Sequence, residues 1–231
     1  MPRATAVLAA LPSPAVIGPA DLPPTSPRLR PAEPADLPVL WALLLVMIGQ
    51  YTIRAHILAP REPGISRSEI QNLAYLLAAR GSPIPVHFAP GQNGPYSTEL
   101  AHILHTMHEQ QLTECADLGA PTETLAPLAL ASGAESQARR ALTDRPELNS
   151  RVEELLHVVD GFESPYGVEL LATVHHMARH SPRPSDPAEI GTRIRSRNHR
   201  GPRLFTQYHV NTALHRLTTT GCLPELSTFS S

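Results

Sequence analysis

The stretch SRSEIQNLAYLLAARG, residues 66–81, carries the clearest secondary-structure signal in this amino-acid sequence. Ser66 and Glu69 have the spacing of a capping box, in which each side chain accepts a hydrogen bond from the backbone N–H of the other residue. Apolar residues then recur every three or four positions, and Gly81 stands where a helix commonly ends. These apolar residues are Ile70, Leu73, Ala74 and Leu77. The stretch therefore predicts a helix with one buried face, and hence a fold that packs helices together.

The same periodicity predicts helices on both sides of this stretch. They are expected at residues 38–53, 97–110, 135–143, 148–161, 165–180, 187–196 and 206–219. Residues 84–88, Ile-Pro-Val-His-Phe, are expected to form a short strand, and a turn should follow at residues 91–95. Two helices, a short strand, a turn and a third helix give a winged-helix-like order. We therefore predict a mostly α fold with short β strands and winged-helix-like helical units.

Composition divides the chain into five parts. Residues 1–37 hold nine prolines, which block helix and strand interiors, and we expect a disordered leader there. A winged-helix-like N-terminal unit is expected at residues 38–117 and a helical C-terminal unit at residues 135–224. Residues 118–134 are rich in Ala, Pro, Thr and Gly and are interpreted as a linker. Residues 225–231 are expected to form a tail.

Charge is nearly balanced over the whole chain but not along it. The 19 basic residues, all arginine, against 21 acidic ones argue against a general nucleic-acid binder. Residues 86–170 hold 13 acidic and 4 basic residues, a net of −9, whereas residues 171–231 hold 3 and 8, a net of +5. The two segments are either differently solvated surfaces, or an acidic face for a basic partner beside a basic loop.

Two features bear on the cellular location. The longest apolar run, residues 39–49, is shorter than a bilayer-spanning helix and suits a buried helix, so we predict no membrane segment. Cys115 and Cys222 form no CxxC pair, and two isolated cysteines give no disulfide framework. A cytoplasmic protein is expected.

Histidine spacing raises the question of a metal site. His102, His105 and His108 lie three apart on a predicted helix, and His176 and His180 lie four apart, as in the HExxH zinc motif. The glutamate of that motif is missing and no third ligand stands nearby, so we expect histidines on polar helix faces and no metal. A nucleophile elbow and glycine-rich nucleotide loops are also missing. We predict no catalytic residues, no cofactor and no enzymatic activity.

Two clusters combine glycine with an aromatic residue. One is Gly-Pro-Tyr-Ser at residues 94–97, and the other is Asp-Gly-Phe-Glu-Ser-Pro-Tyr-Gly at residues 160–167. Each cluster is either a tight turn with a packed aromatic ring or a surface that presents tyrosine and carboxylate groups to a partner. The candidate partner-binding residues are Tyr96, Asp160, Glu163 and Tyr166.

These clusters belong to four blocks that resemble the C-terminal part of DarG-type antitoxins, with a distant similarity to Panacea-type antitoxin domains. The blocks are residues 69–81, 94–104, 161–175 and 203–223. The third, GFESPYGVELLATVH, is similar to the family pattern G-F-E-[ST]-P-[YF]-G-x-E-L-L-[AS]-T-V-H. The resemblance covers residues 38–224, and it departs from the family pattern at Asn72, where the family has lysine, and at His176 and Cys222, where it has tryptophan.

The resemblance implies a partner protein. In DarG, an N-terminal macrodomain removes ADP-ribose from DNA, and the C-terminal part binds the toxin DarT, a DNA ADP-ribosyltransferase, and blocks its DNA site. Residues 1–37 are too few and too rich in proline for a macrodomain. The resemblance therefore implies a non-catalytic antitoxin-like domain that occupies the DNA site of a DarT-like toxin by DNA mimicry.

Three alternatives remain open from the sequence. The first is a winged-helix DNA-binding regulator whose loop arginines contact phosphates. These arginines are Arg193, Arg195, Arg197, Arg200 and Arg203. The second is an enzyme with a histidine metal site, and the third is a non-functional detached fragment of a DarG-type antitoxin. The oligomeric state is not indicated.

Overall fold

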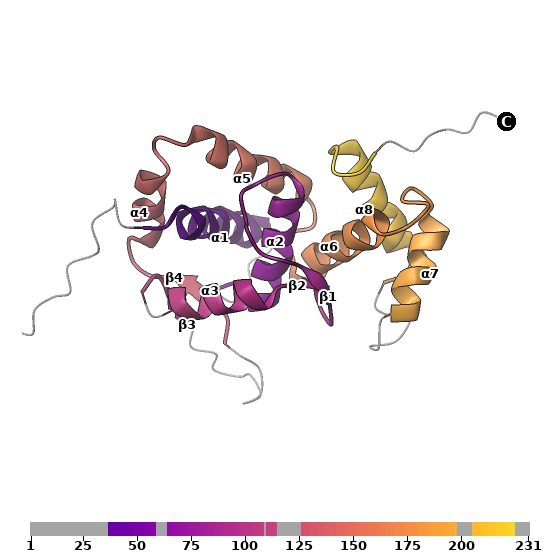
Figure 1. Ribbon diagram of the computed structural model, residues 1–231, viewed down its shortest axis with the longest axis horizontal. Coiled ribbons are helices and arrows are strands. Elements are labelled where there is room, and N and C mark those ends of the chain that lie inside the picture. Colours follow the sequence, from indigo (N-terminus) through magenta and orange to yellow (C-terminus); the bar gives the residue numbers. More distant parts are fainter. Residues whose placement is uncertain (1–36, 59–63, 109, 115–125, 198–204, 225–231) are drawn as a thin grey trace, which may run out of the picture. The chain divides into compact units, whose positions relative to one another are not determined.

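The computed structural model describes residues 37–58, 64–108, 110–114, 126–197 and 205–224 (Figure 1). Apart from Leu37, the predicted leader lies outside these residues, as do the predicted tail, Cys115, Arg200 and Arg203.

Eight helices make up most of the described part of the chain. They are α1 (Val39–Leu58), α2 (Arg67–Ala79), α3 (Thr98–His108), α4 (Ala134–Ala141), α5 (Pro146–Val158), α6 (Pro165–Arg179), α7 (Pro187–Arg197) and α8 (Gln207–Thr219). Each predicted helix is present with slightly shifted ends, and α1 extends past residue 53. The prediction of a mostly α fold with short strands is confirmed, whereas the winged-helix-like character of the units stays a prediction.

Two short antiparallel pairs complete this part of the structure. β1 (Ala89–Gly91) and β2 (Gly94–Tyr96) form a hairpin, and β3 (Leu112–Glu114) pairs with β4 (Leu128–Leu130). In the hairpin Gly91 lies opposite Gly94, so the turn predicted at residues 91–95 contains a two-residue loop. β4 lies within the segment that was interpreted as a linker.

The predicted strand at residues 84–88 is wrong. Pro83 and Pro85 have no N–H group to donate to a neighbouring strand. Two of the other donors bond locally, since Ile84 N lies 2.8 Å from the Ser82 carbonyl oxygen and Val86 N lies 2.9 Å from that of Ile84. Strand pairing therefore begins only at β1.

The predicted capping box of α2 is confirmed and has a second role. The backbone N–H of Glu69 donates to Ser66 Oγ, and the backbone N–H of Ser66 donates to Glu69 Oε2 over 3.0 Å. The other carboxylate oxygen, Glu69 Oε1, accepts a hydrogen bond from the Tyr51 hydroxyl at 3.0 Å, and both side chains are buried. The box that starts α2 thus also fastens it to α1.

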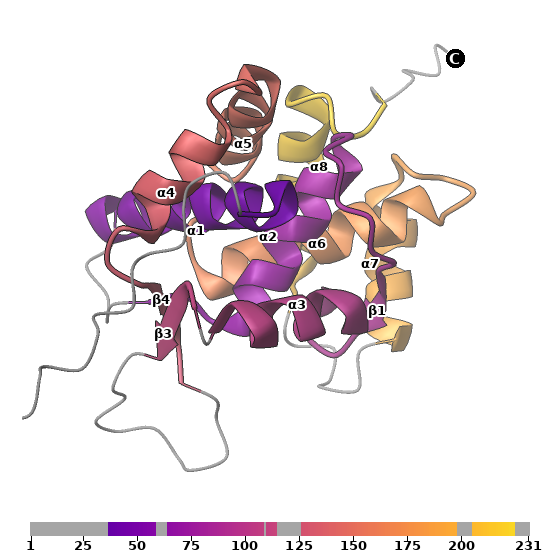
Figure 2. The same cartoon turned by 60° about the vertical axis from the view of Figure 1, so that its left-hand side comes forward.

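Helix α1 is a buried helix of the hydrophobic core. Its residues 42–48 are fully buried, and it packs against α4 and α5 (Figure 2). Each fully buried leucine in such a helix contributes about 1.5–3 kcal/mol through the hydrophobic effect. By length and composition α1 is able to cross a membrane, but it is buried for much of its length, as core helices are, so it does not indicate a membrane protein.

Helices from both sides of the predicted linker pack together. α2 contacts α5 and α6, and α6 in turn contacts α7 and α8. Strand β2 also lies against α6, which places the hairpin beside that helix (Figure 1). The division into two units at residues 118–134 stays a prediction.

Candidate functional site

Two buried amide side chains of α2 hold the β1–β2 hairpin. Gln71 Nε2 donates to the Ser97 carbonyl oxygen over 2.8 Å, and the Ser97 backbone N–H donates to Gln71 Oε1 over 2.9 Å. One residue further on, Asn72 Nδ2 donates to the Asn93 carbonyl oxygen over 2.9 Å. Because both amides are buried, these bonds fix the position of the hairpin on α2.

Gly94 has to be glycine for two reasons. Its φ of +96° lies in the region that L side chains rarely adopt. A Cβ atom at this position would also collide with Asn72 Oδ1. The close approach of hairpin and helix therefore depends on the glycine of the Gly-Pro-Tyr cluster.

The hairpin forms one wall of a pocket with a volume of about 460 Å³. The other walls come from α6, from α7 and from the residue before the cap of α8. The lining residues are Pro90, Gly91, Gln92, Gly94, Pro95, Glu169, Thr173, His176, Met177, Ile194 and Phe205. Most of the lining is apolar. Among these residues, Glu169 and His176 have ionisable side chains. The volume lies in the range of small-ligand and anchor-residue pockets.

A buried polar chain includes Tyr75, whose ring packs against His176 of the pocket wall. The Tyr75 hydroxyl lies 2.8 Å from His175 Nδ1, and His175 Nε2 lies 3.3 Å from the Cys222 carbonyl oxygen. Since a carbonyl oxygen only accepts, Nε2 carries the hydrogen and Nδ1 accepts the hydrogen bond from Tyr75. Burial lowers the pKa of His175 to about 4, which keeps the ring neutral, and burial raises the pKa of Tyr75.

The expectation of polar-face histidines is only partly right. His102 and His105 on α3 and His180 at the end of α6 are exposed, but His176 on α6 is buried. The His176 ring packs against Tyr75 and against His180, with ring centroids 4.4 Å apart in the latter pair. In the ranges that the structure describes, no group of three or more His, Cys, Asp or Glu residues is arranged to hold a metal ion.

The turn between α5 and α6 is held by charged groups. Gly161 has a φ of +83°, and its backbone N–H donates to Glu163 Oε2 over 2.7 Å. The Glu163 side chain is only 2% exposed. Asp160 is paired on the surface with Arg54 at 3.2 Å and with Arg216 at 3.5 Å. Glu163 thus shapes the turn, while Asp160 faces solvent.

Two of the four predicted partner-binding residues are exposed tyrosines on β2 and α6, and the other two are acidic residues in the turn before α6. Tyr96 on β2 is 47% exposed and Tyr166 at the start of α6 is 36% exposed. The Tyr166 ring packs edge-on against Phe205 of the pocket wall. Asp160 and Glu163 belong to the preceding turn. Their role in binding stays a prediction.

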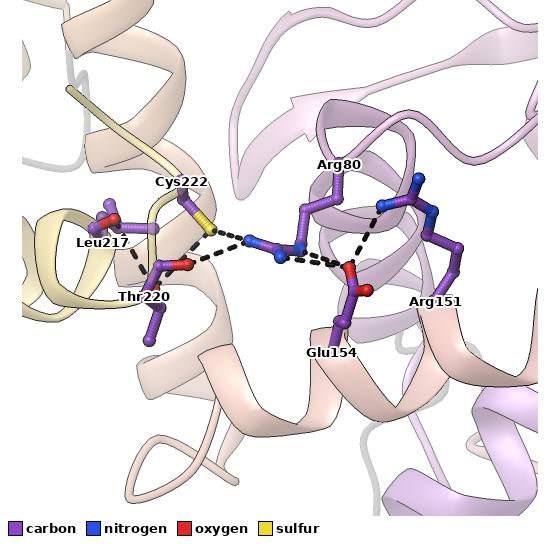
Figure 3. A network of polar contacts seen from close by, with 6 residues as sticks. All are labelled: Arg80, Arg151, Glu154, Leu217, Thr220 and Cys222. Atoms are coloured by element: carbon purple, nitrogen blue, oxygen red, sulfur yellow. Dashed lines mark hydrogen bonds and ion pairs between the residues drawn. The ribbon is translucent and has the colours of Figure 1, made fainter.

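Outside the pocket, Arg80 joins three segments (Figure 3). Its guanidinium donates to the Thr220 carbonyl oxygen at 3.1 Å, to Cys222 Sγ at 3.3 Å and to Glu154 Oε2 at 3.1 Å. Arg151 Nη1 contacts the same Glu154 oxygen. The hydrogen bond from Arg80 lowers the pKa of Glu154. This network ties the end of α2 to α5 and to the residues after α8.

The arginines proposed for phosphate contact are partly engaged. Arg193 donates to the His180 carbonyl oxygen and lies 3.5 Å from Glu189. Arg195 contacts Gln207 and Thr192. DNA binding by this segment stays a prediction.

Several residues of the site were missed in the sequence. The sequence analysis predicts no structural role for Gln71 or Asn72, although two adjacent amides within a buried helix are a signal for one. Thr173, Met177 and Ile194 gave no signal, because ordinary helix periodicity explains them.

No family model matches the chain. The chain is 30% identical over 181 residues to proteins named DNA ADP-ribosyl glycohydrolase from Mycobacterium tuberculosis and Mycobacterium bovis BCG, which covers 76% of this chain and 51% of each relative. It is 34% identical over 200 residues to a protein of the same name from Thermus aquaticus, covering 86% of this chain and 49% of the relative. The chain is thus related to DarG-like proteins over most of its length, and it spans about half the length of these relatives.

These relatives contradict one expectation. The prediction of a protein without enzymatic activity is wrong by this comparison, because the name of all three relatives denotes an enzyme activity. The absence of catalytic motifs from a single sequence was too weak a basis for that expectation, since a hydrolase needs no motif of fixed spacing.

Proposed function

We propose that this chain binds a DarT-like DNA ADP-ribosyltransferase toxin and keeps DNA out of its active site. The proposed docking surface, here the hairpin face, consists of the β1–β2 hairpin, the first half of α6 and Phe205. The observation that carries the proposal is the convergence of the four similar blocks on this face. Gln71 and Asn72 of the first block hold the hairpin of the second, and Glu169 and Phe205 of the last two share its pocket.

The exposed side chains on this face suit a protein interface. Tyrosine is enriched among residues that dominate binding energy. Tyr96 is exposed directly after Pro95 of the pocket wall, and the exposed Tyr166 packs against Phe205 of that wall. A toxin that modifies DNA needs a positively charged groove, and the segment from residue 86 to 170, with its net of −9, supplies the opposite charge. Asp160, exposed on the turn before α6, is our candidate for a direct charge contact, while Glu163 would act by holding the turn. A partner that acts on DNA implies a cytoplasmic location.

The first test is capture of the partner. Tagged protein is used to pull interacting proteins from a lysate of its native cell, and the retained proteins are identified by mass spectrometry. The proposal expects a DNA ADP-ribosyltransferase, whose transfer of ADP-ribose to single-stranded DNA the purified chain then inhibits. Tyr96→Ala should weaken inhibition at least tenfold, as expected for an interface hot spot. Tyr208→Ala, at a tyrosine that is 75% exposed on α8, is the matched control and should inhibit normally. An unaffected transferase would contradict the proposal.

The charge argument has a separate test. Asp160→Asn should weaken toxin binding more at 50 mM than at 500 mM salt, because salt screens exposed charges. Asp144→Asn, at an exposed carboxylate before α5, is the control. Equal effects of the two variants at both salt concentrations would refute a specific role for Asp160.

The name of the relatives favours a second candidate, the removal of ADP-ribose from DNA. One observation supports it, since Glu169 and His176 line the same pocket and are residue types that serve as general acids and bases. Purified protein should then release ADP-ribose from a modified oligonucleotide, and Glu169→Gln should lower the rate about 100-fold or more. A rate equal to that of buffer for the unaltered chain would exclude this candidate.

A further inference from the structure

Helix α8 carries a row of exposed side chains that does not belong to the hairpin face. The row, here the α8 stripe, lies on one side of the helix because its members are three or four positions apart. They are Tyr208, Asn211, Thr212 and His215, and all four are exposed. Tyr208 is 75% exposed, and α8 contains no acidic residue. The stripe is therefore a polar surface with an open aromatic ring and no negative charge.

Hydrogen bonds between side chains hold Arg195 of α7 beside this stripe, where α7 packs against α8 (Figure 1). Arg195 Nη1 donates to Gln207 Oε1 over 3.3 Å, and Gln207 Nε2 donates to Asn211 Oδ1 over 3.0 Å. Gly191 permits this contact, because a Cβ atom there would collide with Gln207 Oε1. Arg195 is exposed and also donates to Thr192 Oγ1. Both acceptors are uncharged, so the guanidinium is positioned without being neutralised.

The acidic groups near Arg195 are engaged elsewhere. Within α7 and α8 as the structure describes them, Glu189 is the only acidic residue, and it lies 3.5 Å from Arg193 and 3.8 Å from Arg183. Among the described residues no carboxylate forms an ion pair with Arg195. Residues 171–231 also carry a net charge of +5. This side of the chain therefore attracts a polyanion.

The chemistry of the stripe suits a nucleic-acid strand better than a protein. A protein interface has an apolar centre, whereas the neighbours of Tyr208 on the stripe offer an amide, a hydroxyl and an imidazole. Proteins hold single strands with aromatic rings that stack on bases and with arginines that contact phosphates. In a duplex the bases already stack on one another, so a ring gains access only after a base is unstacked. An exposed tyrosine beside an arginine thus favours a single strand.

We propose that the α8 stripe and Arg195 bind single-stranded DNA, with one base stacked on Tyr208 and a neighbouring phosphate at Arg195. The polar side chains of Asn211 and His215 continue the track along the helix. The choice of DNA over RNA rests on the proposed function, because both of its candidates place the chain at DNA. Strand binding itself rests on the stripe. Such a contact holds the chain at the strand on which the toxin acts, while the acidic segment faces the toxin.

The test is the fluorescence anisotropy of a labelled oligothymidine of about 15 nucleotides, titrated with the full chain. We expect a Kd of about 1–100 µM at low salt, the range of non-specific binding. Tyr208→Ala should weaken binding about tenfold through loss of one stacked base, whereas Tyr96→Ala, at the exposed tyrosine of the hairpin, should bind normally. Arg195→Met should reduce the slope of log Kd against log salt by about 0.7, the value for one single-strand phosphate contact. Arg145→Met, at an exposed arginine before α5, should leave the slope unchanged.

Four outcomes would overturn the inference. They are a lack of binding at low salt, equal or tighter binding of a duplex of the same length, tighter binding of oligouridine, and an unchanged Kd in Tyr208→Ala. Arg195→Lys keeps the charge and should keep the slope, which separates a phosphate contact from a structural role of the side chain.

Toxin inhibition distinguishes this inference from the proposed function. Tyr208→Ala should still inhibit the toxin, whereas Tyr96→Ala should inhibit it poorly and still bind the oligonucleotide. If the chain inhibits the toxin but does not bind the oligonucleotide, only the inference fails. If the oligonucleotide binds but no toxin is captured, strand binding stands and the proposed function fails.

Discussion

Replacing His175 with glutamine should flatten the acid side of the stability curve of this protein. The native pKa of His175 is lowered to about 4, first by burial and then by the nearby charges of Arg179, His176 and His180, against an ordinary value of 6.5. Between these values the unfolded chain binds a proton that the native protein does not bind. The free energy of unfolding therefore falls as the pH decreases from 6.5 towards 4.

The size of this effect follows from the two pKa values. Linkage gives a loss of about 2 kcal/mol from His175 alone between pH 7.5 and pH 5. The variant lacks this titration, so its free energy of unfolding should change by about 2 kcal/mol less over the same interval. The measurement is urea denaturation followed by circular dichroism at both pH values. At pH 7.5 the variant should itself be less stable by about 1–2 kcal/mol, because the buried Tyr75 hydroxyl loses its acceptor.

A control separates burial from histidine content. His157 is exposed on α5, so His157→Gln should keep the pH dependence of the unaltered protein. If His175→Gln showed the same loss of stability between pH 7.5 and pH 5 as the unaltered protein, the reasoning about a buried neutral ring would be refuted.

Three further substitutions test the packing around the site. Gly94→Ala should lower the free energy of unfolding by about 2–3 kcal/mol, since it combines a positive φ with a collision. The control, Gly133→Ala, has a φ of +81° but open space around it and should cost about 1 kcal/mol. Equal costs would contradict the close approach of the hairpin to α2. Arg80→Met should lower stability by about 1–2 kcal/mol by releasing the segment after α8, and Arg139→Met, which breaks a pair within α4, should cost about 0.5 kcal/mol or less. A Tm unchanged in the first variant would argue against the cross-link. Tyr51→Phe should lower the free energy of unfolding by about 1–2 kcal/mol, because it removes one hydrogen-bond donor from the buried carboxylate of the capping box. Urea denaturation at pH 7.5 measures this loss. An unchanged free energy of unfolding would show that water replaces the hydroxyl.

The helices were predictable because their signals are local. Ser66 caps α2 as its spacing with Glu69 predicts, and Ser164 and Thr206 likewise accept hydrogen bonds from the first turns of α6 and α8. Gly81 adopts a positive φ just beyond α2, the helix that it was expected to end, and Gly221 does the same after α8. Each of these features depends on residues within a few positions of one another.

The candidate site was not predictable in the same way. Its pocket joins residues from four segments, and the distance in sequence from Pro90 to Phe205 leaves no periodic signal. The hydrogen bond between Tyr75 and His175 spans 100 positions. The wrong strand at residues 84–88 is a different case, because the evidence against it was local. Pro83 and Pro85 have no N–H groups to donate to a neighbouring strand, and the sequence itself shows this. The most useful signal in the sequence was a polar residue, such as Gln71, on a helix that is otherwise apolar. Such a residue indicates a buried hydrogen bond to another segment.

The attachment of the hairpin to α2 has a consequence for protein engineering. Gln71 and Asn72 bond to the backbone carbonyl and amide groups of Asn93 and Ser97, not to their side chains. The exposed side chain of Gln92 at the tip is therefore available for randomisation while the backbone that displays it stays anchored. Variants at this position would sample binding specificity on a pre-ordered scaffold, in the manner of an antibody loop on its framework.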